Sequence, residues 1–283
     1  MPAPGPLLLP QREKGFLLDA MTPILMLGAG RMGGALLEGW ARIAAFSADQ
    51  FILRDPHPGD AAQAAAHSGA RLNPPDAVLA EAATVLVAVK PQIWRDAAQA
   101  VAPLLRPDAI VVSIAAGVST VDLAQVFGAR PIARVMPTTG VAIAKGVASI
   151  AAVDPRARAA AHALFDPVAT TVELADEALI DVATAVSGSA PAYYYAFVEA
   201  LEAAGEAQGL PPQAARALVR ATMISAAALM DHTGLDPAEL RRQVTSPGGT
   251  TEAALKVLMG EHGLGQLAAD AVEAAVRRAR ALG

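Results

Sequence analysis

Between Pro23 and about Leu174, the chain alternates short apolar runs that contain β-branched residues with longer runs that are rich in alanine. This alternation is typical of repeated strand–helix–strand units, which build a largely parallel sheet. The short runs predict strands at 24–27, 51–54, 71–73, 84–89, 109–115, 131–136, 147–153 and 170–174. The longer runs predict helices at 32–46, 59–68, 93–105, 120–127 and 155–165.

After about Leu174 the strand signals stop, and proline and glycine residues divide the rest of the chain into five predicted helices. These helices begin near 191, 211, 237, 250 and 265. We therefore expect an α/β domain at 21–174 and an all-α domain at 175–283. The first 20 residues carry four prolines within ten positions and predict a disordered extension at 1–20.

The second of the C-terminal helices reads AARALVRATMISAAALM and is apolar over most of its circumference. A helix of this kind must be buried on several sides. A helical domain of about 110 residues offers too little interior for that purpose. The sequence thus predicts an intertwined homodimer built from these helices. A monomer with this helix at the centre of its own bundle is the alternative.

Composition and charge exclude several classes of protein. Apolar residues make up 54% of the 283 residues and charged residues 17%, which argues against a disordered or coiled-coil chain. The formal net charge is −5 and no run of lysine or arginine interrupts the mixture, so we expect no nucleic-acid partner. No segment approaches the roughly 18 uninterrupted apolar residues that a membrane-spanning helix needs, so we expect no membrane partner.

The absence of cysteine narrows the possible chemistry further. With Cys 0, the chain has no disulfide, no thiolate nucleophile and no iron–sulfur cluster. This composition is compatible with the cytoplasmic location that we expect. The five histidines show no i, i+4 pairing and lie in polar contexts, so we predict no metal site.

Three glycines mark the turn between the first predicted strand and the first predicted helix. Gly28, Gly30 and Gly33 form the pattern GxGxxG, in which the first glycine permits a tight turn and the second admits a pyrophosphate. The third allows close packing of helix on strand, and the helix N-terminus faces the anion. The sequence therefore predicts a Rossmann-type dinucleotide-binding domain. A glycine-rich turn with only a structural role is the alternative.

The end of the second predicted strand carries residues that discriminate between dinucleotides. Asp55 follows Gly33 by 22 residues, which matches the spacing of an acid that binds the ribose 2′-hydroxyl of NAD. Arg54 beside it could instead meet the 2′-phosphate of NADP, or it could be a solvated surface charge. We therefore expect NADPH or NADH. The complete set of expected cofactor residues is Gly28, Ala29, Gly30, Arg31, Met32, Gly33, Arg54, Asp55, Ala88, Val89, Lys90, Pro91, Ala115, Ala116 and Gly117.

A second glycine-rich segment, LRRQVTSPGGTT at 240–251, lies in the helical half. Gly248 and Gly249 free the backbone to turn its amides inward, ahead of a new helix. Such a group of amides at a helix N-terminus can hold an anion, most simply a carboxylate. An ordinary turn and helix cap is the alternative. A second polar turn at Ser187, before another helix, favours a binding site.

Six motifs occur in the order and spacing of one enzyme family: GAGRMG, VKP, SIAAGV, RVMP, TAVSGSAPAY and VTSPGGTT. From Met21 to its C-terminus, the chain resembles the pyrroline-5-carboxylate reductases. The resemblance implies reduction of 1-pyrroline-5-carboxylate to L-proline with NAD(P)H, a helical dimerisation domain and rings of dimers. Thr138 stands where the family commonly has asparagine, and Ala190 where it has glycine.

The resemblance also assigns roles to residues of the helical half. It implies that the Thr251 hydroxyl lies by the imine nitrogen, as a hydrogen-bond donor or proton relay. It places the amides of Gly248, Gly249 and Thr250 on the substrate carboxylate, with Ser246 shaping the loop. Because the cofactor motif lies in the other half, we expect an active site between the domains.

Two other functions compete with this interpretation. A β-hydroxyacid dehydrogenase shares the two-domain plan, but it uses a catalytic lysine within a GxxGxxxKxxN pattern. Lys256, the only lysine of the helical half, lacks that pattern. The departures at Thr138 and Ala190 leave room for a catalytically inactive dinucleotide-binding regulator.

Overall fold

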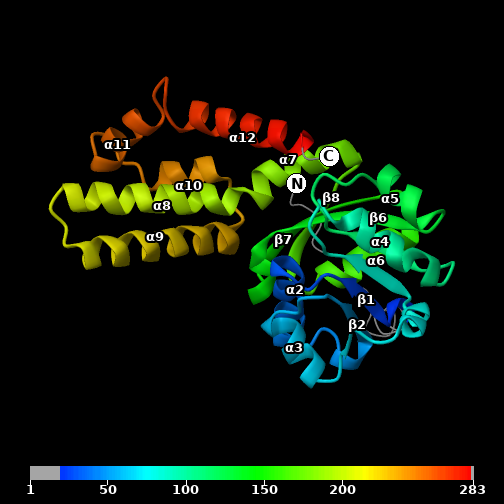
Figure 1. Ribbon diagram of the computed structural model, residues 1–283. Coiled ribbons are helices and arrows are strands. Elements are labelled where there is room, and N and C mark those ends of the chain that lie inside the picture. Colours follow the sequence, from blue (N-terminus) through cyan, green and yellow to red (C-terminus); the bar gives the residue numbers. More distant parts are fainter. Residues whose placement is uncertain (1–19, 282–283) are drawn as a thin grey trace. The chain divides into compact units, whose positions relative to one another are not determined.

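The computed structural model describes residues 20–281, and an eight-stranded sheet forms the centre of its N-terminal part (Figure 1). The strands are β1 (Ile24–Leu27), β2 (Phe51–Arg54), β3 (Arg71–Leu72), β4 (Thr84–Val87), β5 (Ile110–Ser113), β6 (Ile132–Pro137), β7 (Gly146–Ala152) and β8 (Ala169–Glu173). They follow the order β3-β2-β1-β4-β5-β6-β7-β8. All eight predicted strands are thereby confirmed, with ends shifted by at most two residues. The predicted extension at 1–20 lies outside the described residues, apart from its last residue.

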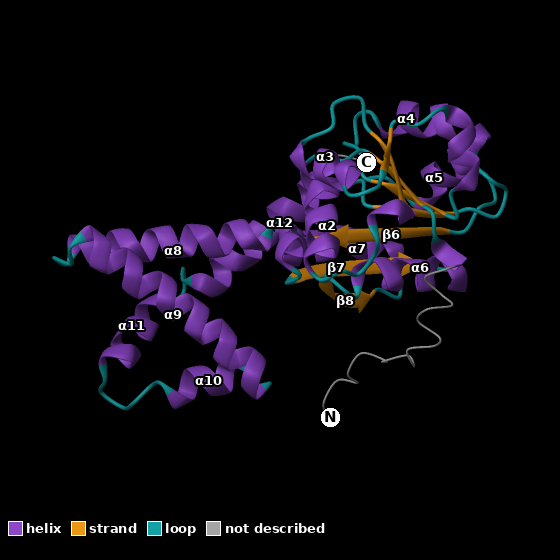
Figure 2. Ribbon diagram, turned by 90° about the horizontal axis from the view of Figure 1, so that it is seen from below, coloured by secondary structure: helices purple, strands orange, loops and turns teal. Residues whose placement is uncertain are grey.

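Helices cover both faces of the sheet (Figure 2). The helices that pack on it are α2 (Arg31–Arg42), α3 (Asp60–His67), α4 (Trp94–Val101), α5 (Thr120–Phe127) and α6 (Pro155–Phe165). Strand β1 is buried on both faces. Its residues Ile24 and Met26 pack in the core under α2, α3 and α6. Leu25 and Leu27 pack in the core under α4 and α5. Strands buried on both faces are typical of parallel α/β sheets. The predicted Rossmann-type fold is confirmed.

The pair β6 and β7 is the one antiparallel pairing of this sheet within the described residues. Only eight residues, 138–145, connect these two strands. A parallel crossover needs about a dozen residues or more. The short connection therefore returns the chain in the opposite direction, and β8 then pairs with β7 in parallel.

The described backbone divides into two compact units, and the first contains residues 20–188 and 276–281. The predicted domain boundary at residue 174 falls inside this unit, because the next turns are anchored to the sheet. Glu177 accepts hydrogen bonds from the Thr120 amide at 2.7 Å and from Arg134 Nη1 at 2.8 Å. Burial would raise the pKa of Glu177, but the hydrogen bonds from Thr120 and Arg134 outweigh burial and hold that pKa below its usual value. Whether 21–174 and 175–283 are separately folding domains stays a prediction.

The second unit, Ser189–Ala275, is helical. Its helices are α8 (Ala190–Ala207), α9 (Pro212–Thr233), α10 (Pro237–Gln243), α11 (Thr250–Leu258) and the first part of α12 (Leu264–Arg280). The five predicted helices are confirmed. Of its residues, only Ala190 and Ala215 are buried in the single chain. No helix among the described residues is long and apolar enough to cross a membrane.

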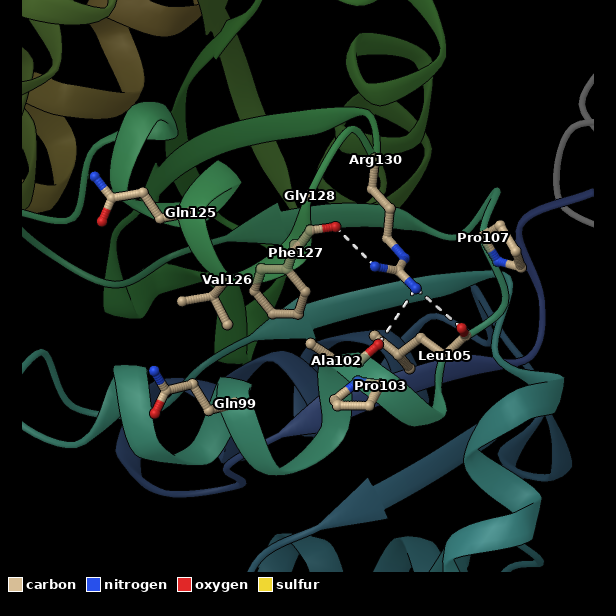
Figure 3. A pocket seen from close by; sticks show the side chains of 10 residues that line it. All are labelled: Gln99, Ala102, Pro103, Leu105, Pro107, Gln125, Val126, Phe127, Gly128 and Arg130. Carbon is tan, nitrogen blue, oxygen red and sulfur yellow. Dashed lines mark hydrogen bonds between the residues drawn. The ribbon is translucent and has the colours of Figure 1, made fainter.

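Arg130 lines a pocket together with residues of α4 and α5, as Figure 3 shows. Its guanidinium donates to the carbonyls of Phe127 at 2.7 Å, Leu105 at 2.9 Å, Arg106 at 3.1 Å and Ala102 at 3.3 Å. These four bonds satisfy carbonyls at the end of α5 and in the segment that follows α4, where the helical hydrogen-bond pattern stops. Arg130 is therefore a structural clamp.

We expect Arg130→Ala to lower the free energy of unfolding by about 2–3 kcal/mol, because several charge-assisted hydrogen bonds are lost together. Arg130→Lys should recover part of this loss, since an ammonium can satisfy fewer of the four carbonyls. Urea unfolding of the three proteins measures the difference. Equal stability of all three would contradict the clamp.

His162 joins α6 to β8 through two carboxylates. Its Nδ1 lies 2.9 Å from Asp166 Oδ1, and its Nε2 lies 2.9 Å from Glu173 Oε1. Burial would lower the pKa of His162, but the hydrogen bonds and charges of Asp166 and Glu173 outweigh it, so the pKa lies above its usual value. The imidazolium form therefore stabilises the folded chain.

This raised pKa predicts a pH-dependent contribution to stability. The contribution is fully present below the unfolded pKa of about 6.5 and is lost as the pH rises through the higher folded pKa. We expect His162→Gln to destabilise the chain more at about pH 6 than at about pH 9. Urea unfolding at both values tests this, and an equal loss at the two values would exclude the imidazolium.

Candidate functional site

The glycine-rich turn after β1 has the geometry that each of its three glycines predicts. Gly28 has φ +87°, and a Cβ there would lie 2.7 Å from Val89 Cγ1. A Cβ on Gly33 would lie 2.5 Å from the Gly28 carbonyl oxygen, so helix and strand pack too closely for a side chain. A Cβ on Gly30 would meet nothing within 4 Å. The turn is therefore tight at two glycines and open at the third, which suits a pyrophosphate.

The N-terminus of α2 opens onto this turn. Gly30 is its N-cap and supplies no side-chain hydrogen bond to the first turn. The first backbone bond runs from the Gly34 amide to the Gly30 carbonyl at 2.7 Å. Among the described residues, the amides of Arg31, Met32 and Gly33 have no acceptor. Free amides at the positive end of a helix dipole attract phosphate, so these residues fit a dinucleotide.

Several other predicted cofactor residues gather at this same edge of the sheet. The Ala29 amide donates to Asp55 Oδ2 at 2.7 Å, which joins the glycine turn to the end of β2. Ala88 follows β4, and its amide donates to the Leu27 carbonyl at 2.8 Å. Strand β1 lies between β2 and β4, so the strand order reverses at β1. Open α/β sheets bind their ligands at such a switch point.

The remaining cofactor residues follow β4 and β5. Val89 contacts Gly28, whereas the next residue, Lys90, is exposed and precedes the half-buried Pro91. Ala115 is buried, and its amide donates to the Ser113 hydroxyl at 3.3 Å. Ala116 is half-buried, and Gly117 has φ +74°. These positions line the carboxyl ends of neighbouring strands, as the sequence predicted.

The Pro-Gly-Gly turn before α11 satisfies part of its own hydrogen bonding. Gly248 has φ +72°, and its amide donates to Glu252 Oε2 at 2.7 Å. The Gly249 amide donates to the Ser246 carbonyl at 3.0 Å. The amides of Thr250 and Thr251, by contrast, have no acceptor among the described residues. Of the three amides expected to bind a carboxylate, only that of Thr250 is open, and the Thr251 amide is a further open donor.

The side chain of Thr251 is half-buried, and its hydroxyl has no hydrogen-bond partner in the described part of the chain. It belongs to the same first turn of α11 as the free amides. A hydroxyl can donate and accept at once. This turn therefore offers the amides of Thr250 and Thr251 and the hydroxyl of Thr251 to a small ligand.

Ser187 lies in the first unit, whereas 246–251 lies in the second. It belongs to a π-helical turn at Thr184–Gly188, and its hydroxyl donates to the Ala183 carbonyl at 2.7 Å. This bond is local, so the structure gives the Ser187 hydroxyl a role in the turn itself. Its predicted contact with substrate stays a prediction.

The two departures from the family pattern both have structural partners. Thr138 is buried, and its hydroxyl accepts a hydrogen bond from the Val147 amide at 2.9 Å while its own amide donates to the Val147 carbonyl at 2.8 Å. Ala190 is buried at the start of α8. Threonine thus secures the short β6–β7 connection at the position where an amide side chain is common.

Sequence reasoning missed the polar contacts that fix these segments. Asn73 bonds both the amide and the carbonyl of Asp55 and adopts φ +46°, a conformation that asparagine tolerates better than most residues, so its residue type is the one local signal of a special role. The hydrogen bonds that Glu177 accepts from Thr120 and Arg134 follow no sequence pattern. Neither does the bond that Glu252 accepts from the Gly248 amide. Among residues 20–281, no group of three histidine or acidic residues could hold a metal ion.

Comparison with known proteins gives two family matches. Residues 177–282 match a family described as pyrroline-5-carboxylate reductase dimerisation. Residues 23–117 match a family described as NADP oxidoreductase, coenzyme F420-dependent. A pyrroline-5-carboxylate reductase of Pseudomonas aeruginosa is 38% identical over 92% of this chain and 97% of the relative. That of Synechocystis is 36% identical over 91% of this chain and 97% of the relative.

Solved structures agree with these relatives. A pyrroline-5-carboxylate reductase of Coxiella burnetii superposes with a TM-score of 0.84 at 29% identity, covering 93% of this chain and 99% of that one. A pyrroline carboxylate reductase of Plasmodium falciparum, solved with NADP bound, has a TM-score of 0.80 at 25% identity, covering 93% and 98%.

Proposed function

Since this chain belongs to the pyrroline-5-carboxylate reductase family, we propose that the first turn of α11 is the part that receives its substrate. The chain is an NAD(P)H-dependent oxidoreductase that reduces 1-pyrroline-5-carboxylate to L-proline, the last step of proline biosynthesis. The single observation that carries the proposal is the pair of free amides at Thr250 and Thr251 beside an unpartnered hydroxyl.

The amides of Thr250 and Thr251 suit the substrate carboxylate. Both stand at the positive end of α11, where an anion is stabilised by the helix dipole and by direct N–H donation. The amide of Gly248 already donates to the Glu252 carboxylate, which supports the proposal that this turn binds a carboxylate. Ser246 and Gly249 hold the turn closed, because a Cβ on Gly249 would lie 2.6 Å from Ser246 Oγ. In this proposal Ser246 and Gly249 shape the site, and Gly248 adds a third amide if the substrate displaces Glu252.

The hydroxyl of Thr251 suits the imine nitrogen. Reduction adds a hydride to the carbon and a proton to the nitrogen of the C=N bond, and bound NAD(P)H supplies the hydride. Thr251 donates its hydroxyl proton to a hydrogen bond at the nitrogen and passes on a proton from solvent. Holding the ring by its carboxylate and by this hydroxyl fixes its orientation, which is where most of the acceleration would come from.

Two rival functions are a β-hydroxyacid dehydrogenase and a catalytically inactive dinucleotide-binding regulator. Lys256, the residue that a hydroxyacid dehydrogenase would need, pairs with Glu252 at 3.5 Å and is mostly exposed. An assay of nicotinamide absorbance with pyrroline carboxylate, with hydroxy acids and with no substrate separates the possibilities. Oxidation of the cofactor with pyrroline carboxylate alone supports the reductase. Turnover of hydroxy acids alone, or none at all, would contradict it.

The dimerisation match and the exposed apolar side chains of the second unit support an oligomer. We extend this to a homodimer that buries the outer faces of α8 and α9, and to rings of dimers. The side chains that would lose solvent contact include Tyr194, Tyr195, Leu201, Leu218, Ile224 and Leu229. Burying apolar area on this scale stabilises association by roughly 25 cal/mol per Å² before entropic costs. Light scattering after gel filtration measures the mass: a dimer or a multiple of it supports the proposal, and a monomer contradicts it.

A further inference from the structure

We propose that Asp55 makes this chain select NADH over NADPH, and that Arg54 takes no part in that choice. The sequence left both residues as candidates, with opposite consequences. Their contacts in the structure now distinguish them. The proposal concerns binding of the cofactor at the glycine turn, so its test does not depend on turnover of any substrate.

Asp55 is held at the cofactor edge by four hydrogen bonds. Its carboxylate accepts from the Ala29 amide at 2.7 Å and from the His57 amide at 2.8 Å. The side chain of Asn73 holds the Asp55 backbone, accepting from its amide at 3.0 Å and donating to its carbonyl at 2.7 Å. Asp55 is only 8% exposed. Its carboxylate is therefore a fixed part of the glycine turn rather than a solvated side chain.

This carboxylate retains acceptor capacity for a ribose. Two carboxylate oxygens offer about four lone-pair sites, of which the two amides use two. The hydroxyls of an adenine ribose are donors and complement the remaining sites of Asp55. A 2′-phosphate would replace one donor with acceptor oxygens and a double negative charge. At a fixed, mostly buried carboxylate, this exchange removes a hydrogen bond and adds like-charge repulsion.

Arg54 is engaged elsewhere. Its Nη1 donates to the Pro74 carbonyl at 3.1 Å, and its Nη2 donates to Asp76 Oδ1 at 2.9 Å. Its charge is thereby paired with the carboxylate of Asp76, which follows β3 in the chain. Recruiting Arg54 to a phosphate would break both bonds. The arginine that could accommodate NADP is thus already used to hold the turn after β3.

The other charged groups near the end of β2 do not reverse this balance. His57 is exposed, and only its backbone amide is used, by Asp55. Asp60 begins α3 and places a second carboxylate in the first turn of that helix. The attraction of this helix N-terminus for phosphate is therefore offset by the charge of Asp60. The segment after β2 thus places two carboxylates, of Asp55 and Asp60, beside one exposed histidine, and the nearest other cation of the glycine turn in sequence is the exposed Arg31 at the start of α2.

Equilibrium binding tests the proposal directly. Titration of the full chain with NADH and with NADPH, followed by nicotinamide fluorescence or calorimetry, should give a dissociation constant at least about tenfold lower for NADH. Asp55→Ser should lower the ratio of the NADPH dissociation constant to the NADH dissociation constant by about tenfold or more. Asp55→Asn, which keeps an acceptor oxygen but removes the charge, should lower it less.

Arg54→Gln is the matched control, because Arg54 lies beside Asp55 and also stabilises a turn. It should leave the ratio of the NADPH and NADH constants unchanged. A general disruption of the glycine turn weakens the binding of NADH and of NADPH equally and leaves the ratio of their dissociation constants unchanged. Loss of structure therefore cannot produce the expected change in this ratio. Equal or tighter binding of NADPH by the wild-type chain would overturn the proposal. So would a selective loss of NADPH binding in Arg54→Gln, or an unchanged ratio in folded Asp55→Ser.

Discussion

Replacing Thr251 with alanine is expected to lower kcat about ten- to a thousandfold, the range of a positioned proton-transfer group. The variant loses the half-buried hydroxyl in the first turn of α11, which has no hydrogen-bond partner among the described residues, and keeps the backbone amides that we assign to the carboxylate. The KM for pyrroline carboxylate should therefore change much less than kcat. Stopped or continuous measurement of nicotinamide absorbance gives both constants.

Two further variants separate this role from a structural one. Thr251→Ser keeps the hydroxyl and should recover most of the rate. Thr233→Ala removes a different exposed hydroxyl of the helical unit, which donates to the Leu229 carbonyl at 2.8 Å, and should leave the rate unchanged. The dissociation constant for NADH should be the same in all of them, because Thr251 and the glycine turn belong to different units. A wild-type rate in Thr251→Ala would remove the residue from the mechanism.

Ile224→Asp is expected to abolish both association and activity. Ile224 lies in α9 with 70% of its surface exposed in the single chain. The unit that contains it has only two buried residues, so its apolar side chains have no interior of their own to enter. If a second copy covers them, a carboxylate at this position is buried without a partner, which costs several kcal/mol.

The matched control for this variant is Val153→Asp. Val153 is also β-branched and 95% exposed, but it follows β7 in the first unit. It should keep the wild-type mass and rate. Light scattering and the nicotinamide assay compare the three proteins. A stable monomer with full activity in Ile224→Asp would show that association is not a condition for catalysis.

The sequence predicted most of the fold because its signals are local. Strands, helices and the glycine turn each follow from residues that are neighbours in the chain. The reversal at β6–β7 was not foreseen, since it follows from the length of a connection rather than from a pattern. Thr138 secures that reversal through the Val147 amide, a contact between residues nine positions apart.

The candidate site could be predicted by residue type, but its hydrogen bonding could not. The two glycines predicted a turn before α11, yet nothing in the sequence shows that the amides of Gly248 and Gly249 donate to acceptors within the same turn. Likewise, Asp55 was a candidate by spacing, whereas its bond to Ala29 joins residues 26 positions apart. Such choices among acceptors depend on three-dimensional distances, and they decide which donors remain for a ligand.

A crystal structure of the chain with L-proline tests the central claim most directly. We predict that the proline carboxylate lies within about 2.7–3.2 Å of the amide nitrogens of Thr250 and Thr251, with the ring nitrogen beside the Thr251 hydroxyl. A proline bound elsewhere, with both amides unliganded, would contradict the account.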